Sequence, residues 1–202
     1  MLDREEYIEQ AYFFRVLDER IREENVILQD LLLSVREEIL STTRLPMAID
    51  FIATELKHMG VFAPALKRMG HYFTPFQTFV AAESENERGR FDLNVALKIL
   101  EREAIYRADN PPPQGVFLYQ FECLARNRLG YDKGMEAISR DPVFDDAWRE
   151  WILIVRRQVQ ENSMGIGASL RRDFDDYEDA ERRTQAVRAQ GHGFRDFLSG
   201  VH

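Results

Sequence analysis

Apolar residues recur three and four positions apart along almost the whole chain, and no segment alternates apolar and polar residues over the length of a strand. A spacing of three to four residues is typical of amphipathic helices, whereas half-buried strands alternate with a period of two. The pattern therefore predicts an all-α protein, a multi-helix bundle of stacked antiparallel helical hairpins with about 8–10 helices.

Several helix ends are marked by their residues. Pro46 suits the first turn of a helix that Gly60 would end in a left-handed conformation, and Thr74 followed by Pro75 is a cap and a first-turn residue for another helix. Within the helix ending at Gly60, the apolar spacing predicts an inward face. That face comprises Ile49, Ile52, Leu56 and Met59.

A run of prolines and a charged C-terminal segment predict the domain organisation. Three consecutive prolines at 111–113 cannot lie inside a helix and hold the chain extended, so we place the main boundary there. The predicted parts are an N-terminal helical bundle (1–110), a helical subdomain packed on it (111–162) and a charged helical tail (163–202). The last helix of the subdomain has a predicted buried face made of Phe144, Trp148, Trp151, Ile152, Val155 and Val159.

The segment from Phe117 to Trp151 contains a spaced set of residues: Leu129-Gly130-Tyr131, then Ala137, Pro142 and the run Asp145 to Trp148. This set resembles the end of one tetratricopeptide repeat running into the next, in which a Gly-Tyr start, a small packing residue and a helix-stopping proline build a helical hairpin. The resemblance implies that residues 114–160 form stacked antiparallel helices.

Charge and composition exclude some classes of function. The net charge is −8 and no block of Lys or Arg stands out, so we expect no nucleic-acid partner. No apolar run reaches the roughly 20 residues of a membrane helix. The acidic N-terminus and the single Cys123, which we expect in the core, predict a cytoplasmic protein. The preference for Arg over Lys suggests a GC-rich, bacterial-like genome.

The strongest candidate metal ligands are Glu55 and His58. A Glu and a His three residues apart on a helix project together and form half of the carboxylate-bridged di-metal motif of ferritin-like proteins. Glu103 is a conceivable further ligand, but the apolar stripes turn it away from the core. The alternative is a solvated Glu/His pair on the flank of the helix.

The segment 71–76 places three aromatic residues, Tyr72, Phe73 and Phe76, within five positions. Such residues line the mouth of many apolar ligand pockets. They also plug the ends of helical bundles, and we favour the plug. Met47, Met59 and Met69 are predicted to fill gaps in the same core.

These observations leave three hypotheses for the function. The first is a non-enzymatic protein-interaction or scaffold module that binds a partner or a second copy through the C-terminal helix. The second is a metal-binding protein that uses Glu55 and His58, and the third is an apolar-ligand binder with its mouth at Tyr72, Phe73 and Phe76. No phosphate loop or zinc signature is present, and we expect no cofactor.

Overall fold

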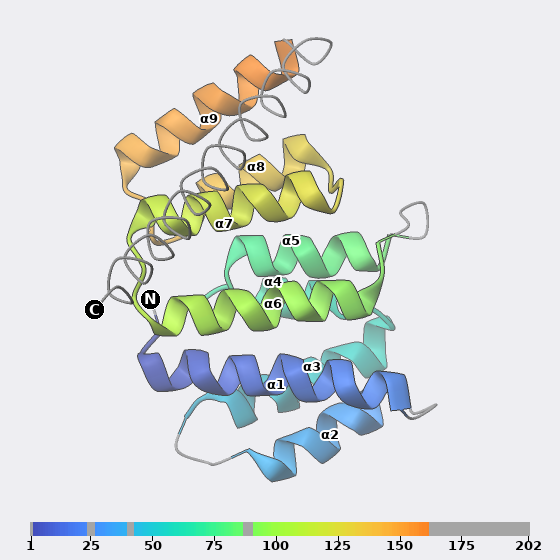
Figure 1. Ribbon diagram of the computed structural model, residues 1–202. Coiled ribbons are helices and arrows are strands. Elements are labelled where there is room, and N and C mark those ends of the chain that lie inside the picture. Colours follow the sequence, from blue (N-terminus) through green and yellow to red (C-terminus); the bar gives the residue numbers. More distant parts are fainter. Residues whose placement is uncertain (1, 24–26, 40–42, 87–90, 162–202) are drawn as a thin grey trace, which may run out of the picture. The chain divides into compact units, whose positions relative to one another are not determined.

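The computed structural model of the chain describes residues 2–23, 27–39, 43–86 and 91–161 (Figure 1). The chain divides into two compact units, Met1–Arg156 and Arg157–His202, and the packing described below is that of the first. The predicted boundaries at residues 110 and 162 stay predictions. The predicted charged tail, 163–202, lies outside the described residues.

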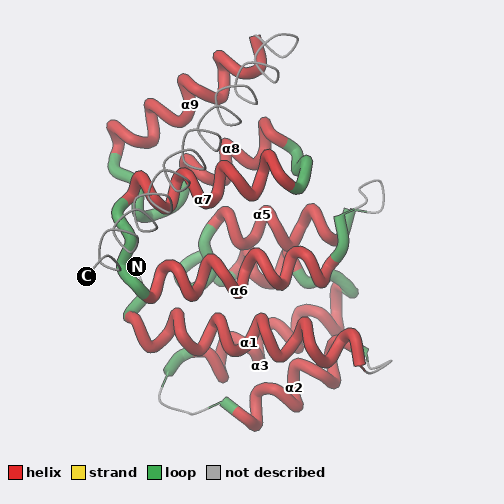
Figure 2. The backbone as a smooth tube through the Cα atoms, in the orientation of Figure 1, coloured by secondary structure: helices red, strands yellow, loops and turns green. Residues whose placement is uncertain are grey.

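All regular structure in the described ranges is helical, which confirms the all-α prediction (Figure 2). Nine helices are found there, and they pack together as a bundle. They are α1 (Arg4–Glu23), α2 (Leu28–Glu38), α3 (Leu45–Met59), α4 (Ala63–Arg68), α5 (Pro75–Ser84), α6 (Leu93–Ala108), α7 (Pro113–Arg126), α8 (Tyr131–Ser139) and α9 (Asp146–Glu161).

Helix α6 is the centre of the packing, because α1, α5 and α7 all lie against it. Its longest contact is with α1, which runs antiparallel beside it although about 90 residues separate the two in the chain. On the far side of α1, α2 and α3 pack against each other, and on the far side of α5 lies α8. A helix surrounded on three sides buries more than one stripe of its surface.

The predicted tetratricopeptide-like character is not confirmed. In such an array each repeat contacts only its neighbours along the chain, whereas here α1 packs on α6 and α5 packs on α8. The glycine at position 134 of α8 is explained by packing instead, because a Cβ at this position would lie 2.5 Å from Leu124 of α7. The glycine therefore allows the close approach of α7 and α8.

The predicted helix ends in the middle of the chain are confirmed. The Thr74 hydroxyl accepts a hydrogen bond from the Gln77 backbone N–H, and the Gln77 side chain accepts one from the Thr74 N–H. Gly60 adopts φ +71° and ends α3. The run of prolines differs slightly from the prediction: Pro112 is extended, but Pro113 is already the first residue of α7, where its missing N–H costs nothing.

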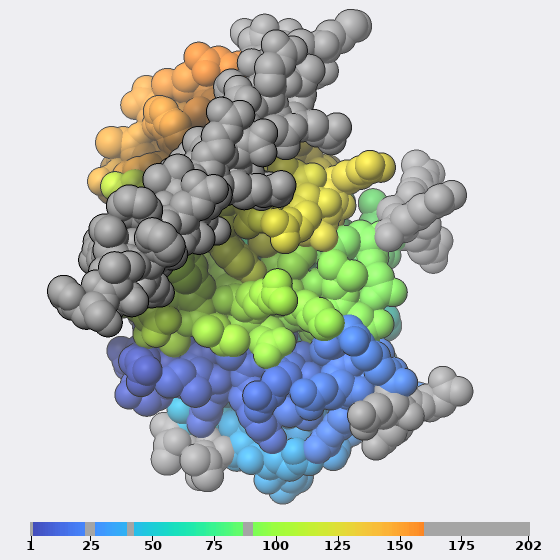
Figure 3. All heavy atoms as spheres, in the orientation of Figure 1, coloured from blue at the N-terminus to red at the C-terminus, as the bar shows by residue number. Residues whose placement is uncertain are grey.

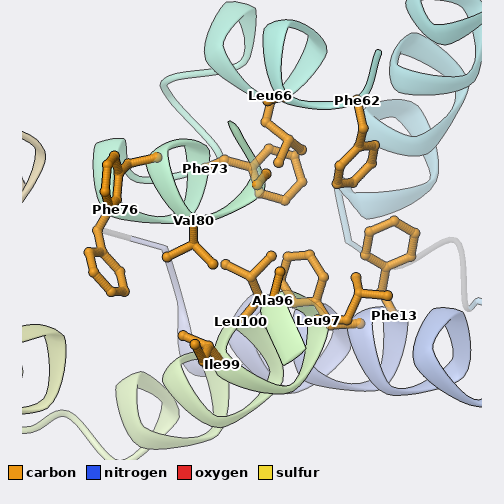
Figure 4. Close-up of a cluster of buried hydrophobic side chains, with 14 of the residues drawn as sticks. Phe13, Phe62, Leu66, Phe73, Phe76, Val80, Ala96, Leu97, Ile99 and Leu100 are labelled. Atoms are coloured by element: carbon orange, nitrogen blue, oxygen red, sulfur yellow. The ribbon is translucent and has the colours of Figure 1, made fainter. Parts of the chain in front are cut away.

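The core is one cluster of apolar side chains drawn from all the described helices. In Figure 4, Phe73, Leu66 and Val80 converge with Leu97 and Leu100 of α6, so residues from the middle of the chain fill the space above α6. Phe13 and Phe14 of α1 are fully buried as well, with their ring centroids 5.3 Å apart.

Three predicted core residues are exposed. Met47 is 66% exposed on the side of α3 opposite its buried stripe, and Met59, 46% exposed, is the last residue of α3, beyond the point where neighbouring helices cover it. Trp151 is 45% exposed, because Ile152 beside it takes the fully buried position on α9. The spacing of apolar residues along one helix does not show where the neighbouring helices stop covering it. All three residues were therefore predicted to be buried.

No helix in the described ranges combines the length and the apolar character required to cross a bilayer.

Candidate functional site

The two predicted metal ligands do not gather further ligands around them in this structure. Glu55 forms an ion pair with Arg68, its Oε2 lying 2.5 Å from Nη1, and His58 is exposed on α3. Among the described residues, no group of three or more His, Cys, Asp or Glu side chains is arranged to hold a metal ion. The metal site stays a prediction, with the Glu55 carboxylate engaged by a guanidinium.

The aromatic residues of segment 71–76 lie inside the core. Tyr72, Phe73 and Phe76 are at most 3% exposed, and the Phe73 ring packs against Phe14 of α1 at 6.3 Å between centroids. The Gln10 side chain donates a hydrogen bond to the Tyr72 backbone carbonyl at 3.1 Å, which ties the segment to α1. In this position the three side chains fill space between helices.

A buried polar cluster was missed by the sequence reasoning. Glu103 and Arg107 of α6, Gln120 of α7 and Asp141, which follows α8, have side chains that are 0–4% exposed. The prediction that Glu103 turns away from the core is wrong. Helix α6 is covered on three sides, so a residue outside its main apolar stripe is buried against α7 rather than facing water.

The cluster is joined by several short hydrogen bonds. Arg107 donates to Glu103 Oε1 from Nε at 3.1 Å and from Nη2 at 2.9 Å, and Nη2 also forms an ion pair with Asp141. The Gln120 amide donates to Glu103 Oε1 at 2.8 Å and to Asp141 Oδ2 at 3.0 Å. The four side chains therefore link α6, α7 and the turn after α8 through polar contacts.

The charges of this cluster do not balance. Two carboxylates share one guanidinium, and no described residue donates a hydrogen bond to Glu103 Oε2. Burial raises the pKa of Glu103, and the nearby Asp141 carboxylate raises it further, against the opposing effect of Arg107. The protonated form of Glu103 is thus favoured in the folded protein relative to an exposed glutamate.

Glu103→Gln tests this electrostatic description through the pH dependence of stability. A carboxyl group whose pKa is raised on folding stabilises the protein below its unfolded pKa, about 4.3, and this contribution is lost as the pH rises through the folded pKa. Glutamine stays neutral, so we expect the variant to gain stability relative to the wild type as pH increases. Urea unfolding of both proteins over a pH series measures the difference, and a difference that does not change with pH would contradict the description.

Cys123 is a buried core residue, as predicted. Burial raises the pKa of its thiol to about 12. The thiol is therefore protonated at neutral pH and is not poised as a nucleophile.

An exposed apolar surface lies on α7 and α9. Leu118 of α7 is 59% exposed, and Trp151 and Ile154, three positions apart on α9, are 45% and 37% exposed. The Phe117 and Trp151 rings pack edge to face at 5.0 Å and so connect the two helices. We call Leu118, Trp151 and Ile154, with the Phe117 ring between the helices, the α7/α9 surface.

Packed aromatic rings and an ion pair support the α7/α9 surface. Trp148 packs against Phe144, Phe117 and Trp151, with centroids 5.3–6.1 Å apart. Arg156 of α9 binds both carboxylate oxygens of Asp132 on α8, at 2.6 and 2.8 Å. These contacts hold α9 in place, so the exposed side chains are presented by a supported helix.

The sequence carried a weak signal for each missed feature. Glu103 and Arg107 are four residues apart, a spacing that allows an ion pair on one helix face, and each is followed by an alanine, a residue that suits a buried stripe. Trp151 and Ile154 interrupt the polar side of α9, so its apolar residues cover more than one face.

Comparisons with protein-family models, with curated proteins and with solved structures gave no match.

Proposed function

We propose that this protein is a non-enzymatic protein-interaction module and that the α7/α9 surface is its contact surface. The observation that carries the proposal is the exposure of Trp151, Leu118 and Ile154 on a base of packed aromatic rings. Apolar side chains grouped in this way mark sites of association more often than single exposed residues do.

The chemistry of the surface favours a protein partner. Tryptophan is enriched among the residues that dominate binding energy, and a rigid ring held by Phe117 and Trp148 loses little conformational freedom on binding. Trp151 and Ile154, three positions apart on α9, are exposed, and Leu118 on α7 follows Phe117, whose ring contacts Trp151. An amphipathic helix with apolar residues three and four positions apart is the partner that suits such a surface.

Charge and cysteine content also bear on where in the cell the partner would be found. A net charge of −8 disfavours nucleic acid, and a single buried thiol suits the reducing cytosol. We therefore expect a cytoplasmic protein partner.

Photo-crosslinking in cells of the native host tests the proposal. A benzophenone amino acid replaces Leu118 in one variant and Ile27 in a control variant; Ile27 is 70% exposed and precedes α2, outside the α7/α9 surface. We expect a discrete protein adduct from position 118 that is absent from position 27. The adduct is expected to disappear when Trp151→Ala is added.

The proposal would be contradicted by identical adducts from both positions, or by an adduct at position 118 that persists in Trp151→Ala. Thermal melting of Trp151→Ala serves as the folding control. Because the side chain is already 45% exposed, we expect its loss to cost much less than that of a buried aromatic residue.

A further inference from the structure

A groove of about 340 Å³ runs between α1 and α6, on a different pair of helices from the α7/α9 surface. Figure 3 shows α1, in blue, directly against α6, in green, on one face of the protein. The residues that line the groove are Arg4, Ile8, Ala11, Tyr12 and Arg15 of α1 and Glu101, Ile105 and Ala108 of α6, with Asp109 at the end of α6.

The floor of the groove is apolar and partly uncovered. Ala11 and Ala108 are small and nearly buried, while Ile8 and Ile105 stand 44% and 50% exposed above them. Small residues beside exposed isoleucines leave room for a side chain from outside to pack between the two helices.

The two rims carry opposite charges. Arg4 and Arg15 lie on α1, and Glu101 and Asp109 lie on the α6 side. None of these four side chains takes part in an ion pair with another residue of the described ranges, although Arg15 stacks on the Tyr12 ring at 5.4 Å. The groove thus has a positive rim and a negative rim, both available to charges from outside.

The order of the charges matches across the groove. Because α1 and α6 are antiparallel, Arg4 lies at the same end as Asp109, and Arg15 lies at the same end as Glu101. At 1.5 Å per residue, the arginines are about 16 Å apart along α1 and the acids about 12 Å apart along α6. Arginine side chains are long and flexible enough to absorb this difference.

From this geometry we infer that the α1/α6 groove binds a second copy of the chain. A two-fold axis parallel to the groove places α1 of one copy over α6 of the other, with Arg4 opposite Asp109 and Arg15 opposite Glu101 in both directions. The other in-plane two-fold axis, perpendicular to the groove, places Arg4 opposite Arg15 and is disfavoured by repulsion. The charge pattern therefore selects one orientation.

The dimer so formed has a four-helix bundle at its centre. Helix α1 is antiparallel to α6 of its own copy and to α6 of the second copy, the arrangement of an antiparallel bundle. Ile8 and Ile105 from both copies would fill the middle, where each is now exposed. The groove and the α7/α9 surface share no residue, so the inference does not rest on the proposed function.

Sedimentation velocity of the full chain across a dilution series tests the inference. We expect a reversible dimer whose dissociation constant rises at least about tenfold in Arg15→Glu and in Glu101→Arg, because each reversal creates two like-charge contacts in the symmetric dimer. An equimolar mixture of the two single variants is expected to restore dimerisation, since positions 15 and 101 then carry opposite charges at both contacts of the mixed dimer. Ile105→Glu is expected to abolish the dimer while the monomer stays folded by circular dichroism.

Three outcomes with the wild type and the groove variants would overturn the inference. They are a monomer at every concentration, a dimer indifferent to both charge reversals, and failure of the mixture to recover association. Trp151→Ala provides the matched control on the other surface: it is expected to dimerise like the wild type, and its loss of dimerisation would assign self-association to α9 instead.

Discussion

Replacing Arg107 by methionine is expected to lower the free energy of unfolding by about 3–5 kcal/mol, because it leaves two buried carboxylates without their guanidinium. Glu103 and Asp141 are at most 1% exposed, so water cannot replace the lost partner without opening the packing of α6 against α7. Urea denaturation at neutral pH measures the loss.

Arg102→Met is the matched control for this prediction. Arg102 is an exposed arginine on the same helix, and we expect its replacement to change stability by less than about 0.5 kcal/mol. Adding Glu103→Gln to Arg107→Met removes one of the two stranded charges and is expected to recover part of the loss. Equal effects of Arg107→Met and Arg102→Met would show that the buried cluster contributes nothing specific to stability.

Phe73→Ala is expected to cost about 3–5 kcal/mol, the usual range for removing a fully buried aromatic ring. The Phe73 side chain is 1% exposed, packs against Phe14 and Tyr72, and belongs to the same buried cluster as Leu97 and Leu100 of α6 (Figure 4). Its removal leaves a cavity that the surrounding helices fill only in part. Chemical denaturation of the variant and the wild type gives the value.

The same variant separates the two interpretations of segment 71–76. A core plug predicts the large loss, whereas the mouth of a ligand pocket predicts a loss below about 1 kcal/mol together with weaker binding of an apolar dye. Ile27→Ala, at a position 70% exposed, is the control and is expected to leave stability nearly unchanged.

The parts of the fold that local chemistry determines could be predicted from the sequence. Gly60 ends α3 because a left-handed residue suits glycine, and Thr74 with Gln77 caps α5 because both side chains reach free backbone groups. The prolines at 111–113 were predicted to break the helical pattern, and α7 begins at the last of them, Pro113. In each case the cause lies within four residues of the effect.

The parts that depend on distant neighbours could not be predicted. The contact of α1 with α6 joins segments about 90 residues apart, and it is this contact, with those of α5 and α7, that buries the side of α6 carrying Glu103 and Arg107. The exposure of Trp151 follows from which side of α9 packs on its neighbours. A single helical stripe contains neither piece of information.

The candidate sites likewise depend partly on local sequence and partly on contacts between distant helices. Glu55 and His58 were chosen by their spacing on one helix, but the ion pair between Glu55 and Arg68 of α4 depends on how α3 and α4 meet. The α1/α6 groove and the α7/α9 surface are built from pairs of helices, so neither exists until the chain has folded.

Fluorine NMR of 5-fluorotryptophan tests the α7/α9 surface most directly, because the chain has two tryptophans and both lie on α9. The Trp148→Phe variant leaves Trp151 as the single reporter, and Arg102→Trp in a background with neither native tryptophan is the control at an exposed position of α6. We predict that in cells of the native host the Trp151 resonance is shifted or broadened relative to the purified protein, well beyond the change at position 102. A Trp151 resonance that changes no more than the control would contradict the proposal that this surface binds a partner.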